Sequence, residues 1–173
     1  ASEANSQAVR EAAEALGSTV TRRPGRGQWH QLVIAGNGNR WHPAGVGGWL
    51  KAIGIHGQRS HEKRLPDAVF TLDNNRLALL LRHLWATDGC IAPRKSGSKG
   101  SDRIYFSTAS ADLAGDVAAL LLRFGIVARL RAVHKSGYRA VHTVDVVGTD
   151  HQRRFLDHIG AFGPRLAAAE RLR

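Results

Sequence analysis

The residues best placed to do chemistry lie in the apolar stretch Leu79–Ile91, where an acid is followed by a glycine, Asp88-Gly89. The leucines, alanines and tryptophan before Asp88 leave almost no polar face and predict a helix that is covered on most sides. The C-terminal end of a helix dipole is negative and disfavours an acid by roughly several tenths of a kcal/mol or more. A cation held by Asp88 would explain the acid. Gly89 is expected to be the left-handed residue that stops this helix. The competing interpretation is that Asp88-Gly89 is only an ordinary turn.

The charge of the chain indicates a polyanionic partner. Its 173 residues contain 25 lysines and arginines against 14 acids, a formal net charge of +11 with a pI near 11.1. Such an excess favours nucleic acid before a membrane surface. We find no apolar run of membrane-spanning length and no signal peptide, and the single cysteine, Cys90, excludes a disulfide framework. These features favour the cytoplasm. The nine histidines show no spacing typical of zinc ligands.

The elements that must position Asp88 follow from residue periodicity, which predicts an α+β chain with antiparallel sheets. Helices are expected over Ser6–Leu16, Pro43–Ile53, Asp73–Asp88, Ser110–Phe124 and Asp150–Ile159. Strands are expected over Ser18–Arg23, Gln28–Ala35, Arg103–Thr108, Ile126–Val133 and Tyr138–Val147. Lys95–Gly100 and Lys135–Gly137 are typical of hairpin loops.

Part of this order occurs twice. Leu50–Arg59 aligns with Leu156–Arg165, and further matches follow upstream at nearly the same spacing. The upstream matches are Val9, Gly17 and Arg23 with Val117, Gly125 and Arg131. Each copy predicts helix, glycine, two strands and a helix, which indicates two pseudo-symmetric lobes rather than a solenoid. The first-copy counterpart of the helix ending at Asp88 would lie upstream of Ala1.

The nine residues Leu81–Gly89 resemble the motif of the LAGLIDADG homing endonucleases, in particular the endonuclease domain inserted in inteins. His61–Phe70 is similar to the family's Lys-x-Ile-Pro block, and Ser107–Ala128 is similar to the block that follows the second motif. The resemblance covers essentially the whole chain, most strongly Ser60–Arg165. It is closest to inteins of actinobacterial or mycobacterial replicative DNA helicases.

The resemblance implies a metal-dependent site with one acid from each of two packed motif helices. Asp88, together with the adjacent Gly89, would bind Mg²⁺ at the scissile phosphate. Lys63 would orient water or steady developing charge, although a plain surface lysine remains the alternative. Two residues depart from the motif: His83 replaces a small glycine at the helix contact, and Ala86 replaces the first aspartate.

The same resemblance places Leu80, Leu84 and Trp85 in the interface between the two motif helices. Without a partner helix these side chains would form an exposed apolar patch that drives dimerisation or instability. We expect Trp29, Trp41 and Trp49 to be core anchors rather than base-stacking residues.

Basic residues in or beside the predicted strands are candidates for DNA contact. Alternate residues of a strand share a face, so Arg129 and Arg131 would point the same way, and arginine on paired strands can read guanine in the major groove. The alternative is that about half of these residues contact only phosphate or solvent. The candidates are Arg22, Arg23, Arg26, Lys95, Lys99, Arg103, Arg129, Arg131, Lys135 and Arg139.

The expected fold is therefore α+β and LAGLIDADG-like, with two pseudo-symmetric lobes, saddle-shaped antiparallel sheets and helices on the outer face. We assign 1–59 to an N-terminally incomplete first lobe, 60–71 to a linker, 72–165 to a second lobe and 166–173 to a C-terminal tail.

The first functional hypothesis is a Mg²⁺-dependent, site-specific endonuclease of double-stranded DNA, carried in cis by an intein splicing domain whose terminal residues this sequence does not show. The second is a DNA-binding domain that has lost one active-site acid and its activity. An RNA-binding or maturase-like protein is a third, weakened because no platform for stacking single strands is evident.

Overall fold

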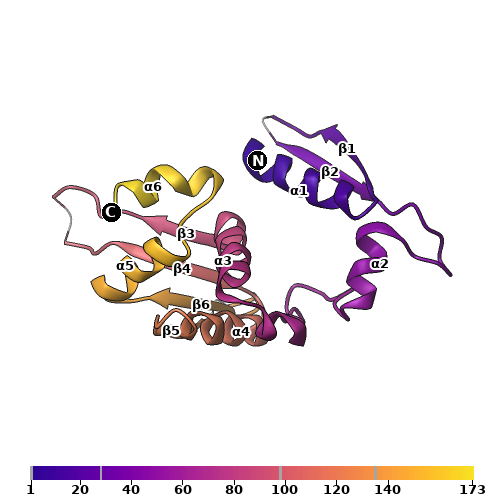
Figure 1. The fold of residues 1–173 in the computed structure, drawn as a ribbon. Coiled ribbons are helices and arrows are strands. Elements are labelled where there is room, and N and C mark those ends of the chain that lie inside the picture. The colour runs from indigo at the N-terminus through magenta and orange to yellow at the C-terminus, as the bar shows by residue number, and fades with distance from the viewer. Residues whose placement is uncertain (1, 28, 98, 135) are drawn as a thin grey trace. The chain divides into compact units, whose positions relative to one another are not determined.

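The computed structural model describes residues 2–27, 29–97, 99–134 and 136–173, and the chain divides into two units, Ala1–Gly57 and Gln58–Arg173 (Figure 1). The predicted α+β class with antiparallel sheets is confirmed. None of the helices in the described ranges is long and apolar enough to cross a membrane.

Unit 1 consists of a strand hairpin between two helices. α1 (Glu3–Ala15) begins at Ser2, whose hydroxyl accepts the Asn5 N–H. β1 (Thr19–Pro24) pairs antiparallel with β2 (His30–Ala35), and α2 (Gly45–Ala52) follows. Among the described residues of this unit, Ala13 is the only buried apolar residue.

The expectation that three tryptophans of unit 1 are core anchors is wrong. Trp29, Trp41 and Trp49 are 54%, 80% and 47% exposed. The physical reason is the small size of the unit, because two strands and two helices offer too little apolar surface to enclose an indole ring.

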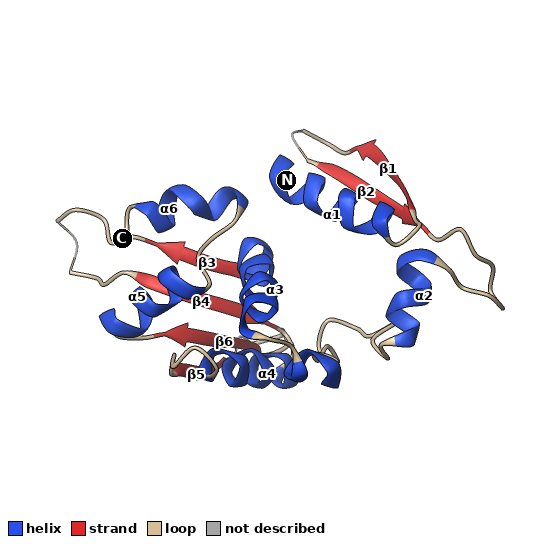
Figure 2. Ribbon diagram, viewed as in Figure 1, coloured by secondary structure: helices blue, strands red, loops and turns tan. Residues whose placement is uncertain are grey.

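Unit 2 is built on a four-stranded antiparallel sheet in the order β3–β4–β6–β5 (Figure 2). The strands are β3 (Gly89–Ala92), β4 (Arg103–Thr108), β5 (Ala128–Val133) and β6 (Val141–Val146). The helices are α3 (Asn74–Asp88), α4 (Ala111–Leu122), α5 (Thr149–His158) and α6 (Leu166–Glu170), with 3-10 turns η1 (Asp67–Thr71) and η2 (Gly163–Arg165).

One face of this sheet forms the core with the helices. Strand alternation places Ile104 and Phe106 of β4 beside Val144 and Val146 of β6 on that face, and all four are buried. The opposing buried side chains are Leu77, Leu81 and Trp85 of α3, Val117, Leu120 and Leu121 of α4, and Phe155 and Leu156 of α5. The opposite face of the sheet is left free of these packed helix side chains.

The repeat expected from the sequence is visible in the structure. α1, β1, β2 and α2 follow one another in the order of α4, β5, β6 and α5. The glycines that close the matching helices adopt the same left-handed backbone, with φ of 78° at Gly17 and 66° at Gly125, and 77° at Gly54 and 71° at Gly160. The repeated order of elements is thus confirmed, whereas the pseudo-symmetric arrangement of two lobes stays a prediction.

Three segments carry more structure than the sequence indicated. β3 was not predicted, because its four residues follow α3 without a turn. The segment assigned as the 60–71 linker contains buried Leu65 and the turn η1. The segment assigned as the C-terminal tail contains α6, whose Ala169 is buried in the core of unit 2.

Ser110 anchors the 60–71 segment to the core, and its loss should be costly. Its fully buried hydroxyl accepts the Leu113 N–H at the start of α4 and donates to the Lys63 carbonyl at 2.5 Å. Replacement by alanine removes the helix cap and leaves a carbonyl without its donor, so we expect Ser110→Ala to lower the free energy of unfolding by roughly 2 kcal/mol. Urea unfolding followed by circular dichroism measures this loss. Ser101→Ala, at an exposed serine, is the control.

Candidate nucleic-acid interface

Asp88 occupies the C-terminal end of α3, as the sequence predicted. The helix is capped at its N-terminus by Asp73, whose carboxylate accepts the Arg76 N–H at 3.0 Å, and it runs without interruption to Asp88. The Asp88 side chain is exposed and has no hydrogen bond or ion pair with any described residue. An unpaired carboxylate at the negative end of a helix dipole is an electrostatically suitable ligand for a hard cation such as Mg²⁺.

Asp88 has no neighbouring ligand set of its own. Within the described ranges, no group of three or more histidines, cysteines or acids is close enough to hold a metal ion. Mg²⁺ commonly keeps several waters and uses only one or two protein carboxylates together with substrate phosphates. The single carboxylate therefore fits a site that is completed by other ligands, not a closed structural site.

The expected role of Gly89 in stopping the helix is wrong. Its backbone is extended, with φ −91° and ψ 165°, because the chain passes directly from α3 into β3. A Cβ atom at this position would lie 2.5 Å from Trp85 Cδ1 and 2.6 Å from Trp85 Cα. Glycine is required here by the close approach of the strand to the tryptophan and not by a left-handed conformation.

Lys63 lies at the same end of the sheet as Asp88. Its carbonyl is held by Ser110, and the nearby Leu65 N–H donates to Asp116 at 2.8 Å, so the segment is tied to α4. α4 begins just after β4 ends, and the β4 residue Phe106 pairs with Gly89, next to Asp88. The Lys63 side chain itself is exposed.

The outer face of the sheet in unit 2 carries the arginines of β4 and β5. Register pairs Arg129 with Asp145 and Arg131 with Thr143, so Arg129 and Arg131 share this face, as the alternation predicted. Arg103 lies on the same face of β4, because its neighbour Ile104 points into the core. About half of each of the Arg103 and Arg131 side chains is exposed, so both are accessible to a large partner.

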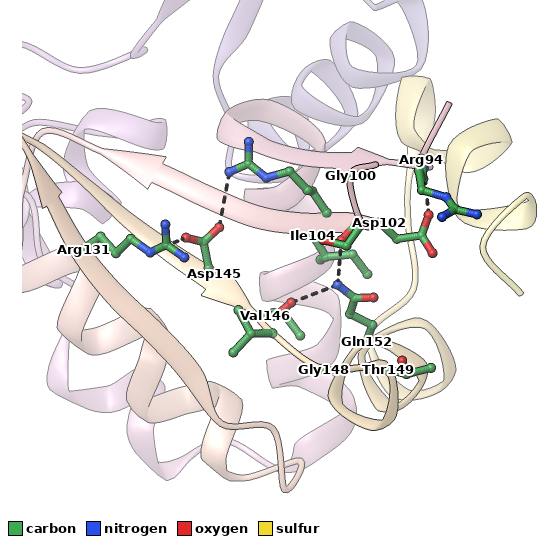
Figure 3. A pocket seen from close by; sticks show the side chains of 13 residues that line it. Arg94, Gly100, Asp102, Ile104, Arg131, Asp145, Val146, Gly148, Thr149 and Gln152 are labelled. Atoms are coloured by element: carbon green, nitrogen blue, oxygen red, sulfur yellow. Dashed lines mark hydrogen bonds and ion pairs between the residues drawn. The ribbon is translucent and has the colours of Figure 1, made fainter. Parts of the chain in front are cut away.

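The sequence analysis missed Asp145, which lies at the centre of this face on β6. One carboxylate oxygen is 3.5 Å from Arg103 Nη2 and the other is 3.4 Å from Arg131 Nε (Figure 3). Arg103 also lies over the Tyr105 ring, 4.5 Å from its centroid. One sequence signal could have revealed Asp145. It is an acid within a strand rich in β-branched residues, and the strands predicted around it carry arginines at alternate positions.

Tyr105 extends this arrangement towards β3. A hydrogen bond with Cys90, the residue opposite it in the β3–β4 register, raises the pKa of the Tyr105 phenol above its ordinary value. The electrostatic influence of the same thiol acts in the same direction. The phenol is therefore neutral at physiological pH, and the guanidinium of Arg103 lies over an uncharged ring.

A hollow of about 580 Å³ opens beside Asp145, between the ends of β4 and β6 and the start of α5. The Asp102 carboxylate accepts the Arg94 N–H at 2.7 Å, and Gln152 donates to the carbonyls of Asp102 and Val146 (Figure 3). The hollow thus has a polar, hydrogen-bonded lining at the edge of the arginine-bearing face.

The structure separates two neighbouring arginines of β1 that the sequence grouped together. Arg22 lies on the face covered by α1, where its guanidinium is 2.7 Å from Glu3 Oε1 and hydrogen-bonds to His30. This contact lowers the pKa of Glu3 below its ordinary value. Arg23 has the opposite orientation, because successive residues of a strand alternate. Both arginines stay candidates, with the guanidinium of Arg22 already paired to Glu3.

The remaining basic candidates lie in turns and loops. Arg26, Lys95, Lys99 and Arg139 are exposed, between β1 and β2, between β3 and β4, or between β5 and β6. Lys135 lies outside the described residues. The strands on either side of the two predicted hairpin segments, β3 with β4 and β5 with β6, pair antiparallel.

The predicted motif-helix interface is only partly available. Trp85 is fully buried against Phe106 and Phe155, with ring centroids 5.6 Å and 4.8 Å away, so its placement in an interface is wrong. Leu80 and Leu84 are half-buried and retain surface for another helix. His83, which replaces the motif glycine, packs against Phe162, with the two ring centroids 4.6 Å apart.

The family comparison defines the class of domain in this unit. Residues 75–160 match the family model described as "LAGLIDADG-like domain". The matched segment runs from α3 to the end of α5 and includes Asp88 and the whole four-stranded sheet. A LAGLIDADG-like domain thus occupies this part of the chain.

Particular relatives are replication proteins of much greater length. The chain is 45% identical over 125 residues to the replicative DNA helicase DnaB of Rhodothermus marinus, covering 72% of this chain and 13% of the helicase. It is 37% identical over 140 residues to the DnaB helicase of Synechocystis, covering 78% of this chain and 16% of that helicase. It is 31% identical over 113 residues to the replication factor C small subunit of Methanocaldococcus jannaschii, covering 65% of this chain and 6% of that subunit.

These relatives confirm the expected link to replicative DNA helicases, but they do not support its actinobacterial or mycobacterial part. The chain spans less than a fifth of the length of each of these relatives.

Proposed function

We propose that this chain is the DNA-recognising and DNA-cleaving part of an intein, a site-specific homing endonuclease that hydrolyses phosphodiester bonds of double-stranded DNA with Mg²⁺. Asp88 would hold the metal ion, with Gly89 beside it, and Lys63 would orient water or steady developing charge. The partners are double-stranded DNA and an intein splicing domain in cis. The proposed location is the cytoplasm, where the DNA is present.

The observation that carries the proposal is the combination of a free acid and an arginine-bearing sheet face in one LAGLIDADG-like domain. Asp88 has no partner among the described residues, which leaves both carboxylate oxygens for a cation. Arg103 on β4 and Arg129 and Arg131 on β5 lie on one face of the sheet, where guanidinium groups can reach base edges and phosphates. The net charge of +11 favours the same partner.

The intein assignment rests on how the relatives match. A helicase and a replication factor subunit share with this chain a segment that makes up only 6–16% of their lengths. A short segment shared by otherwise different proteins is typical of an inserted element. The resemblance of Leu81–Gly89 to the intein endonuclease motif supports the same interpretation.

Bound Mg²⁺ would supply Lewis-acid stabilisation of charge on the phosphate. The contribution of the chain would be to position the ion. The α3 helix holds the Asp88 carboxylate at its end, and Ser110 holds the backbone of Lys63 at the same end of the sheet. The sheet face would bind the duplex and set its register.

A DNA-binding domain without cleavage activity is the second candidate. The observation in its favour is that Asp88 is the single motif acid within the described residues and that no cluster of metal-ligating side chains surrounds it. Such a domain would bind a specific duplex and neither cut nor nick it.

A dimer, in which Leu80 and Leu84 of two copies pack together, would supply the second acid that the cleaving candidate requires.

The test is cleavage of a duplex that joins the host-gene sequences flanking the insert. We expect cutting with Mg²⁺ and none after addition of EDTA. Binding measured over a salt series should show log K falling linearly with log salt, by about 0.9 for each neutralised phosphate. Selective binding without any cut, also after an N-terminal motif helix is added, would establish the second candidate. Absence of binding to this duplex and to random duplex DNA would reject both.

A further inference from the structure

Asp145 is a buried acid on the arginine-bearing sheet face of unit 2. Only 6% of the residue is exposed, although it lies on the sheet face opposite the apolar core. Burying a carboxylate is costly unless cations and hydrogen bonds compensate it. The compensating groups are Arg103 from β4 and Arg131 from β5, which approach its two oxygens from opposite sides.

The two arginines are thereby held in defined orientations while their outer surfaces remain open. Arg103 is fixed twice, by Asp145 at 3.5 Å and by the Tyr105 ring at 4.5 Å. Arg131 is bound through Nε at 3.4 Å, which leaves its terminal amino groups free of this contact. Both side chains remain about half exposed. A guanidinium fixed at one edge can offer its remaining donors without first losing conformational freedom.

We propose that Asp145 is a specificity-determining positioning residue, which holds Arg103 and Arg131 across three strands so that each presents its free donors to a base edge. The proposal rests on the proposed function in that the ligand is duplex DNA. The acid also opposes indiscriminate binding, because a negative charge within the basic face weakens its attraction for phosphates of any sequence.

The expected effect of Asp145→Asn therefore has opposite signs for two kinds of duplex. Releasing the arginines should weaken binding to a preferred duplex, and a correctly placed arginine contributes discrimination of about tenfold or more against a wrong base. Removing the negative charge should at the same time strengthen binding to an unrelated duplex. A residue that only supports the fold would weaken binding to both.

The experiment compares two probes, a duplex selected by the wild-type chain from a random-sequence pool and a shuffled duplex of the same length and composition. We expect Asp145→Asn to lower the ratio of the two affinities by about tenfold or more, with a higher affinity for the shuffled duplex. Asp67→Asn is the matched control, because it removes one exposed carboxylate paired with an arginine, Arg64, at 3.6 Å. Asp67→Asn should leave the ratio of the two affinities unchanged.

Two further measurements separate this proposal from loss of folding and from failure of the proposed function. Asp145→Glu keeps the charge but displaces the carboxylate, and it should lower the ratio without strengthening binding to the shuffled duplex. Relaxation of the arginine Nε–Hε groups, recorded without DNA, should show Arg103 and Arg131 ordered in the wild type and mobile in Asp145→Asn.

An unchanged affinity ratio in both Asp145 variants, or arginine groups that are mobile in the wild type, would overturn the positioning role. A parallel loss of both affinities with reduced thermal stability would also overturn it, in favour of a structural role. If the wild type selects no duplex, the proposed function fails, and the relaxation measurement still decides whether Asp145 positions the two arginines.

Discussion

Asp88→Asn is expected to abolish Mg²⁺-dependent cleavage while leaving DNA binding nearly unchanged. The amide keeps the size of the side chain but loses the charge that attracts the ion. Stabilisation by a metal ion is worth several kcal/mol, and each 1.36 kcal/mol corresponds to a tenfold change in rate, so cleavage should slow by at least about a hundredfold. The fold should be unaffected, because Asp88 is exposed and unpaired within the described part of the chain.

The rate of cleavage should be followed on the duplex that joins the flanking host sequences, and affinity should be measured on the same duplex with Ca²⁺ in place of Mg²⁺. Both residues 1–173 and a version extended by an N-terminal motif helix should be assayed, because the resemblance implies one acid from each of two motif helices. Asp157→Asn is the matched control, since Asp157 is also an exposed aspartate in the last turn of a helix, α5. Cleavage by the Asp88 variant at the wild-type rate would contradict the metal role.

Trp85→Ala is expected to destabilise the chain more than any other substitution discussed. The indole is fully buried between Phe106 and Phe155 and lies against the backbone of Gly89. Truncation of a buried aromatic residue to alanine costs about 3–5 kcal/mol, and a domain typically has only about 5–15 kcal/mol in total. We therefore expect unit 2 to be marginally stable or unfolded at 37 °C.

Denaturant unfolding followed by circular dichroism measures this loss independently of tryptophan fluorescence. Trp85→Phe should cost much less, because it keeps an aromatic ring and removes an indole N–H that has no hydrogen-bond partner among the described residues. Trp41→Ala, at a tryptophan that is 80% exposed, should change stability by less than about 0.5 kcal/mol. A small effect of Trp85→Ala would instead favour the interface role that the sequence indicated for this residue.

Much of the secondary structure was predictable because local rules decide it. The caps of α3 and α4, at Asp73 and Ser110, lie where the sequence changes from polar to apolar periodicity. The alternation that puts Arg129 and Arg131 on one face depends only on the strand period. The duplicated order of elements was likewise visible, because left-handed glycines such as Gly17 and Gly125 mark equivalent helix ends.

Errors arose where the answer depends on residues far apart in the chain. Trp85 was expected at an interface, since the motif pattern does not show that Phe106 and Phe155 enclose it. The ion pair of Arg22 with Glu3 was not foreseen, because only the packing of α1 on β1 brings these side chains together. Gly89 was taken as a helix stop because the short strand β3 that follows it gains its definition from pairing with β4.

The sequence by itself determined that this is a basic α+β chain with two repeated lobes, a motif helix ending in Asp88 and a set of arginines on strands. These properties follow from composition and from periods of a few residues. Only the tertiary structure decided which of these side chains share a surface. Asp145 lies between Arg103 and Arg131 because β6 is inserted between β4 and β5, a neighbourhood set by strand order that no local pattern encodes.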